Sequence, residues 1–246
     1  MIALRRPSWF AVLLTLCGVA VFIALGIWQL HRARYHQAVL ARFTRAAAAP
    51  VQPFAMVERA APTDVYPHVQ VRGTFAAHRV YLLDNRMHAG QLGVDVFVPF
   101  TPDNRDRLLL VDLGFVSRQG PQEMLPELPP LPEHEIALRG LYAPPPAPGL
   151  KLGGDALKDE RSWPKVLTYI DMNAIAADLH RQLYPRVLLL DADPASPYMR
   201  QWTPEVIAPA RNRAYAFQWF TFALAAVVIF FLMHRKRDAS AMDEKN

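Results

Sequence analysis

Cysteine is almost absent from the chain, which has only one, Cys17, among 246 residues. A single thiol excludes an intramolecular disulfide and any zinc or iron–sulfur site built from several cysteines. Phosphate-binding loops, Gly-x-Ser-x-Gly elbows and histidine pairs at the i, i+4 spacing of metalloproteases are missing too. We therefore predict no catalytic residue and no enzymatic activity.

Charged residues are absent from two long stretches, 7–30 and 214–233. At ~1.5 Å per helical residue, each stretch is long enough to cross a hydrocarbon core of ~30 Å. The first stretch ends in Trp28-Gln29 and not in the small residues that precede signal-peptide cleavage. The sequence therefore predicts two transmembrane helices, at residues 9–30 and 215–233.

The charge that flanks these spans predicts the side of the membrane that each part occupies. Arg5 and Arg6 precede the first span, and the basic run 234–237 follows the second. Positive flanks favour the cytoplasm, whereas long loops translocate largely regardless of charge. Because the first seven residues leave no room for an Arg/Ser-rich organellar presequence, we expect a bacterial inner-membrane protein. The predicted parts are cytoplasmic tails at 1–8 and 234–246 and a periplasmic domain at 31–214.

The basic pI, near 9.5, reflects those flanks and does not indicate a nucleic-acid surface. Residues 31–214 contain 21 Lys and Arg against 19 Asp and Glu, so most of the net charge of +5 lies in the short tails. A nucleic-acid-binding domain would concentrate positive charge on the folded part. We therefore expect membrane lipid, and no nucleic acid, among the partners.

The large loop changes from a helical to a β pattern. Residues 31–47 lack Gly and Pro, so the first helix should continue out of the membrane and stop near Pro50. After it, "YPHVQVRGTF" alternates apolar and polar residues, and "RLLLVDLGFV" is apolar enough to be buried on both faces. Asp171 is positioned to cap a helix over 172–183. Strands are expected at 66–75, 78–85, 94–100, 107–116, 133–142, 163–170 and 184–192, with turns at 84–93 and 103–106.

These elements define the predicted fold class. We expect an α+β membrane protein in which two transmembrane helices flank an extracytoplasmic domain. That domain should contain an antiparallel β-sheet or small barrel and at least one helix, since short strands and turns alternate along it. Nine prolines fall between Pro121 and Pro148, and they predict an extended spacer.

The two predicted spans carry mirrored pairs, Trp28-Gln29 and Gln218-Trp219. Because the spans run in opposite directions, both pairs should lie near the outer edge of the membrane. Tryptophan is common at that interface, but an amide in hydrocarbon is costly without a partner. The two glutamines should therefore face the other helix or a shared ligand, and helix pairing alone or a ligand or partner site would explain them. Helical spacing extends the pairs into two stripes: Trp28, Arg32 and Tyr35 in one, Asn212, Tyr215 and Trp219 in the other.

Several segments resemble one known family. "LGIWQLHR" resembles the Gly-x-Trp-Gln-Leu-x-Arg signature at the end of the first span in the surfeit locus protein 1 (Shy1-like) family. "RAYAFQWFTFALA" resembles the Tyr-Ala-x-Gln-Trp opening of its second span. The segments between them fall in the family's order along nearly the whole chain: "YPHVQVRGTF", "LLDNRMHAGQLGVDVFVPF", "RGLYAPP", "WPKVLTYID" and "YPRVLLL".

The resemblance implies a role in the assembly of cytochrome c oxidase, a haem–copper terminal oxidase. Members are non-enzymatic assembly factors, or chaperones, thought to help deliver haem a to the catalytic subunit or insert it there. The implied cofactor is haem a, and the implied partners are that subunit and other oxidase assembly factors. The alternatives are a haem-free scaffold and a structural accessory subunit of a respiratory membrane complex.

The chain departs from the family pattern in three places. His36 stands where Lys is common, Leu113-Gly114-Phe115 where Arg-Gly-Trp is usual, and Asn212 where members commonly carry the histidine that would ligate haem iron. An amide is a poor iron ligand, so the usual route of ligation is closed at this position.

We name His31, at the outer end of the first span, as the candidate metal ligand in its place. Arg32 and Arg213 could pair with the porphyrin propionates. The complete predicted cofactor site is Trp28, Gln29, His31, Arg32, Asn212, Arg213, Tyr215, Gln218 and Trp219.

Overall fold

The computed structural model describes residues 6–59, 65–76, 78–118, 127–146, 157, 162–200, 202 and 208–235. The chain divides into two compact units. Unit 1 consists of Met1–Val39 and Val206–Asn246, and unit 2 of Leu40–Glu205. Two predicted features, the proline-rich stretches around 121–126 and 147–149 and the basic run beyond Arg235, lie outside the described residues.

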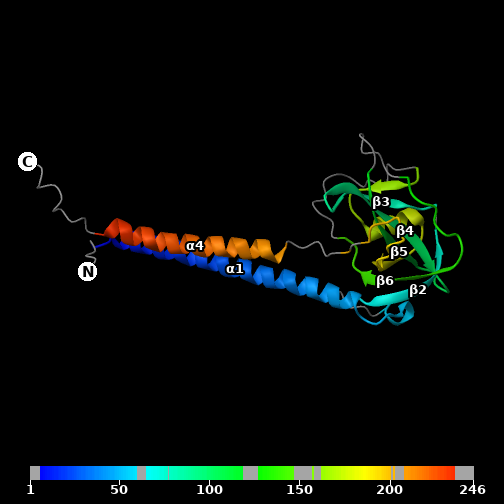
Figure 1. Ribbon diagram of the computed structural model, residues 1–246, viewed down its shortest axis with the longest axis horizontal. Helices are drawn as coiled ribbons and strands as arrows, with labels where there is room; N and C mark the ends of the chain where they lie inside the picture. The colour runs from blue at the N-terminus through cyan, green and yellow to red at the C-terminus, as the bar shows by residue number, and fades with distance from the viewer. Residues whose placement is uncertain are drawn as a thin grey trace, which may run out of the picture. The chain divides into compact units, whose positions relative to one another are not determined.

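Unit 1 is formed by two helices, α1 (Trp9–Ala47, whose turns from Leu40 onward belong to unit 2) and α4 (Pro209–His234). Figure 1 shows them running side by side in opposite directions. Their most apolar windows have mean hydropathies of 2.7 and 2.1, and only 6% and 11% of these windows are buried in the protein. A core helix of a soluble protein would be mostly buried, so these are candidate membrane spans. The prediction that the first helix continues through residue 47 is confirmed.

Unit 2 contains a closed five-stranded barrel, part of which is labelled in Figure 1. Hydrogen-bonded neighbours follow the order β2, β6, β8, β5 and β4, and a further pairing of β4 with β2 closes the circle. The barrel strands are β2 (His68–Phe75), β4 (Gln91–Pro102), β5 (Leu108–Ser117), β6 (Ile136–Ala143) and β8 (Leu183–Leu190). The remaining elements are β1 (Gln52–Pro53) beside β2, η1 (Phe54–Met56), β3 (Tyr81–His88) beside β4, β7 (Lys165–Leu167) beside β3, and α3 (Met172–Leu179).

The barrel confirms the predicted fold class and, of the two alternatives, an antiparallel sheet or a small barrel, it is the barrel that forms, with mixed strand directions. β5 and β8 pair in parallel, as do β3 with β7 and β1 with β2. The chain reaches β8 through β7 and α3, and a crossover of this kind allows parallel pairing, which a short hairpin cannot. The predicted turn at 84–93 is also narrower, because β3 extends to His88. Ala89 and Gly90, with φ values of 50° and 80°, form a two-residue turn to β4.

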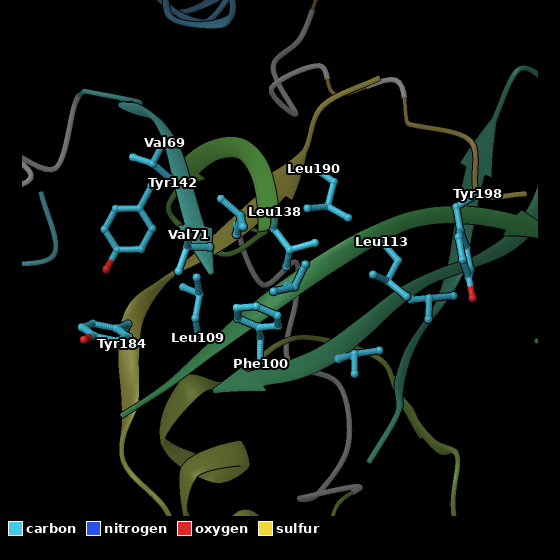
Figure 2. Packing of buried hydrophobic residues seen from close by; sticks show 14 of the residues in the cluster. Val69, Val71, Phe100, Leu109, Leu113, Leu138, Tyr142, Tyr184, Leu190 and Tyr198 are labelled. Carbon is cyan, nitrogen blue, oxygen red and sulfur yellow. The ribbon is translucent and has the colours of Figure 1, made fainter. Parts of the chain in front are cut away.

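The barrel interior is filled by side chains from all five strands. Along β2, Val69 and Val71 are buried while Gln70 and Arg72 are exposed, as the alternation in the sequence predicted. Figure 2 shows Val71, Phe100, Leu109 and Leu138 pointing toward one another from different strands. Burying a large apolar side chain contributes ~1.5–3 kcal/mol, so this cluster is the main source of stability for unit 2.

A second apolar cluster lies on the outer face of the sheet, under α3. Ile175 of α3 is fully buried there with Phe97 and Leu110. Asp171 caps α3 as predicted, because its carboxylate accepts from the backbone amides of residues 173 and 174. Because β4 and β5 are covered on both faces, they are apolar along nearly their whole length.

Candidate functional site

The contact between α1 and α4 is built from small residues and aromatic rings. Phe22 stacks on Trp219 with 5.9 Å between ring centroids. A Cβ added at Gly26 would lie 2.6 Å from the ring of Phe220, so this glycine permits the close approach. Residues on the two contact faces recur at three- and four-residue intervals, as in a coiled coil: Phe22, Gly26, Gln29, Ala33 and His36 on α1, and Asn212, Ala216, Trp219 and Ala223 on α4.

A buried hydrogen bond joins the two helices at the end from which the chain enters unit 2. The side-chain amide of Asn212 donates to Nδ1 of His36 over 3.1 Å. Both side chains are buried, with exposed fractions of 3% and 7%. Because an amide nitrogen can only donate, Nδ1 of His36 is the acceptor in this hydrogen bond. The side chain of Asn212, at the position where the family pattern has histidine, is therefore part of the contact between the helices.

Gln29 and Gln218 occupy different environments. Gln29 lies on the contact face, between the Gly26–Phe220 contact and the His36–Asn212 hydrogen bond. Its Oε1 is buried and has no hydrogen-bond partner among the described residues. Gln218 is exposed on α4. The mirrored amides therefore do not pair with each other, and only Gln29 meets the expectation of facing the other helix.

The predicted iron ligand, His31, is not brought to Asn212. His31 is exposed, and at ~100° per residue it lies on the side of α1 opposite the contact face. The structure brings His36 to Asn212 instead. The sequence carried a signal for this, because His36 is seven residues beyond Gln29 and hence on the same side of the helix.

The remaining predicted residues fall on three surfaces. Trp28, His31 and Arg32, together with Tyr35, share one exposed side of α1, which we call the outer face of α1. Within it the guanidinium of Arg32 lies over the ring of Trp28, 5.4 Å from the centroid. On α4, Tyr215 and Gln218 are exposed on one flank of the helix contact, Arg213 is exposed on the other, and Asn212 and Trp219 belong to the contact itself.

Unit 2 contains a buried polar cluster near Gly114, where the family pattern also differs. Asp95 accepts from Nε of Arg86 over 2.7 Å, and Asp112 accepts from the backbone amide of Gly114 over 3.1 Å. Burial, followed by the negative charge of Asp95, raises the pKa of Asp112 well above its ordinary value. Arg200 donates to the carbonyl of Leu113 over 3.0 Å, and burial lowers its pKa. A raised pKa keeps the proton on Asp112 to higher pH, which reduces its repulsion with Asp95.

A second polar network in unit 2 joins Glu58 to Arg105 and Tyr184. The carboxylate of Glu58 accepts from Arg105 over 2.8 Å and from the hydroxyl of Tyr184 over 2.7 Å. These hydrogen bonds, led by that of Arg105, lower the pKa of Glu58. Nearby, the hydroxyl of Tyr142 is buried without a hydrogen-bond partner among the described residues, and burial raises its pKa to about 12.

No group of three or more His, Cys, Asp or Glu side chains in the described ranges is arranged to hold a metal ion. Both polar networks of the barrel are satisfied mainly by arginine, which neutralises carboxylates and does not ligate metals. Their arrangement fits the support of strands and loops.

The sequence pattern that defines the SURF1 family matches residues 16–224. The chain belongs to the SURF1 family. The match begins within α1, covers the whole barrel and ends within α4, so it includes both the His36–Asn212 contact and the buried cluster near Gly114. No curated protein matches the chain. SURF1 family members are cytochrome oxidase assembly factors and are generally non-enzymatic.

Two positions at which the chain differs from the SURF1 family pattern, 113–115 and 212, have defined surroundings in the structure. At the segment Leu113-Gly114-Phe115, Gly114 has a φ of 124°, which favours glycine, and its amide binds Asp112. The guanidinium of Arg200 lies beside the carbonyl of Leu113, so positive charge is present here although residue 113 is apolar. At residue 212, in contrast, no imidazole of α4 is present, and the nearest one, His36, belongs to α1.

Proposed function

We propose that this SURF1 family member assists the delivery or insertion of haem a into the catalytic subunit of a haem–copper oxidase. Its place would be a bacterial inner membrane, with both termini in the cytoplasm and the barrel in the periplasm. The observation that carries the proposal is the family match over residues 16–224, together with two candidate membrane helices. Partners would be the catalytic subunit and other oxidase assembly factors.

The outer face of α1 is the surface that suits a porphyrin. It presents the imidazole of His31, the guanidinium of Arg32 and the aromatic rings of Trp28 and Tyr35, all exposed. An imidazole nitrogen can ligate haem iron, and a guanidinium pairs well with a propionate. Arg213 lies on the opposite flank of the helix pair and Asn212 is buried in the contact, so neither belongs to this surface. The cofactor residues we propose are therefore those of α1.

In this arrangement the protein holds the cofactor and performs no chemistry on it. His31 would fix the iron, Arg32 would neutralise a propionate, and the aromatic rings would cover the apolar macrocycle. His36 and Asn212 would act at a distance, by holding α1 against α4 through their hydrogen bond. Haem a itself supplies the redox-active iron that the oxidase later uses.

A haem-free scaffold is the second candidate function. It is favoured by Asn212, because the side chain at that position donates to His36 and provides no iron ligand. Such a protein would stabilise an immature oxidase subunit through the helix pair or the barrel. A structural accessory subunit would differ from both, because it would remain in the mature enzyme.

The deciding experiment is purification of the full chain from cells that make haem a, followed by an absorption spectrum. Bound haem a in the wild type, lost in His31→Ala and kept in the control His78→Ala, would support the proposed site; His78 is exposed in unit 2. Haem retained in full by His31→Ala would remove His31 as the ligand. Absence of haem with co-purification of immature oxidase would favour the scaffold. Stoichiometric presence in mature oxidase would overturn both functions.

A further inference from the structure

Each of the two helices carries an Arg-x-Arg sequence, called a bracket below, whose central residue lies in the contact between the helices. In α1, Arg32 and Arg34 flank Ala33, and in α4, Arg211 and Arg213 flank Asn212. The central residue of each bracket is buried in the contact, at 4% exposed for Ala33 and 3% for Asn212. All four arginines are exposed. Each helix therefore presents two cations on either side of the residue that meets its neighbour.

The periodicity of the helices fixes how these cations are distributed. Adjacent residues are ~100° apart around a helix, so the two arginines of a bracket point to opposite flanks of the contact. Because α1 and α4 are antiparallel, Arg34 lies on the same flank as Arg213, and Arg32 on the same flank as Arg211. Each flank of the helix pair thus carries one guanidinium from each helix.

The paired cations match in depth on the flank of Arg34 and Arg213. On the other flank, Arg32 lies ~6 Å to the membrane side of the His36–Asn212 hydrogen bond and Arg211 ~1.5 Å to its far side, so that pair is staggered by ~7.5 Å. The His36–Asn212 hydrogen bond sets the register of the two helices. At ~1.5 Å per residue, Arg34 lies ~3 Å and Arg213 ~1.5 Å to the membrane side of that bond. Packed helices lie ~8–10 Å apart, so two arginines at this depth can reach one group between them. The uncharged spans begin only a few residues deeper, at Leu30 and Ala214.

No acidic side chain balances these cations within the helix pair. Neither α1 nor α4 contains Asp or Glu. Among the described residues, the only side-chain interaction recorded for these four arginines is that of Arg32 with the ring of Trp28. Positive charge next to a translocated domain runs against the usual charge bias of membrane proteins. Within the described part of the two helices, the four guanidinium groups are therefore available to an anion from the surroundings.

We propose that each flank of the helix pair binds the phosphate of an anionic phospholipid in the leaflet next to the barrel. Phosphate is the group that two guanidinium forks recognise best, by bidentate hydrogen bonds from each. The depth, just beyond the ends of the apolar spans, is that of the lipid headgroups. The duplication also favours lipid, since a bilayer supplies headgroups to both flanks whereas a single ligand would need one. The bound lipids join α1 to α4 at the level of the His36–Asn212 contact.

The test uses the full-length protein in a neutral detergent and native mass spectrometry with phosphatidylglycerol or phosphatidylcholine of identical acyl chains. The wild type should retain two phosphatidylglycerol molecules and bind phosphatidylcholine more weakly. Arg34→Gln with Arg213→Gln should lose one of the two and bind it roughly thirtyfold more weakly, since each cation near an anionic lipid contributes about a fivefold effect. Arg34→Lys with Arg213→Lys should fall in between, because lysine keeps the charge without the fork.

The matched control is Arg72→Gln with Arg139→Gln, which removes two exposed arginines of the barrel and should change nothing. Equal retention of the two lipids by the wild type would overturn the proposal, as would equal loss in the control. If the Arg34/Arg213 variant instead released haem and kept its lipid, the flank would be a propionate site and the lipid assignment would be wrong. This variant leaves His31 and Arg32 intact, so its outcome is separate from that of the proposed haem surface.

Discussion

The hydrogen bond between His36 and Asn212 makes a quantitative prediction about the helix pair. Replacing Asn212 with Leu removes the amide that donates to Nδ1 of His36, at a site where both side chains are almost fully buried. In water-soluble proteins, an unpaired buried polar group costs ~1–3 kcal/mol. Between membrane helices the measured values are smaller, ~0.6 kcal/mol on average and ~1.7 at most, because the separated helices find other partners.

The membrane values apply to this contact, because both helices are candidate spans. We therefore expect a coupling of ~0.6–1.7 kcal/mol between the two residues, equivalent to about a threefold to eighteenfold change in the helix-pairing equilibrium. The assay is a double-mutant cycle of His36→Leu and Asn212→Leu, with the free energy of unfolding measured by SDS titration in mixed micelles.

The matched control is the same cycle with His31→Leu in place of His36→Leu. His31 lies on the opposite side of α1, so its effect should add to that of Asn212→Leu within ~0.3–0.5 kcal/mol. Additivity in the His36 cycle, or equal coupling in both cycles, would refute the proposed pairing and the register derived from it.

Three further predictions concern the barrel and the topology. Gly140→Ala should destabilise unit 2 by ~1–3 kcal/mol or more in chemical denaturation, because the added Cβ would lie 2.1 Å from a backbone carbonyl oxygen of β8. The control is Gly18→Ala, which should leave stability unchanged or slightly higher because nothing lies within 4 Å of its added Cβ. The pKa of Asp112 is raised in the folded state, so as the pH rises the unfolded state loses this proton first. The stability that Asp112 contributes is therefore complete below its usual pKa of 3.8. Above that pH it falls by up to ~1.4 kcal/mol per pH unit. Asp112→Asn should remove this component of the slope in denaturation curves recorded from pH 4 upward, and an unchanged slope would contradict the assignment. Alkaline phosphatase fused at Pro146 should be active and fused at Asn246 inactive, and the reverse pattern would invert the proposed orientation.

Local patterns in the sequence predicted the elements of the fold well. The absence of Gly and Pro in 31–47 indicated the long helix, the alternation around Val69 and Val71 indicated β2, and Asp171 marked the start of α3. These features depend on residues close together in the chain. Closure of the barrel depends on β2 pairing with β4 and β6, and the parallel entry of β8 depends on a crossover through α3. No local pattern encodes which strands become neighbours.

The site was predicted in part for a related reason. Depth in the membrane follows from counting residues, so the level of Trp28 and Trp219 could be estimated from the sequence. The direction of each side chain around the helix requires knowledge of the contact face. Ranking candidates by depth alone selected His31, whereas the face that contains Gly26 and Ala33 also contains His36. The same omission led to the expectation that Gln218 faces the other helix or a shared ligand, whereas it is exposed on α4.

Closure of the barrel also limits how the domain can be recognised. At the ends of its strand order are β1 and β7, with two and three residues, and beyond β7 the edge of β3 is bent by a bulge near Asn85, whose φ is 57°. Short and bulged edges leave few backbone groups to which a foreign strand could add. We therefore expect a partner of unit 2 to bind its side chains or loops and not to add a strand to the sheet. Short and bulged edges also remove a route by which unit 2 could mispair with strands of other chains.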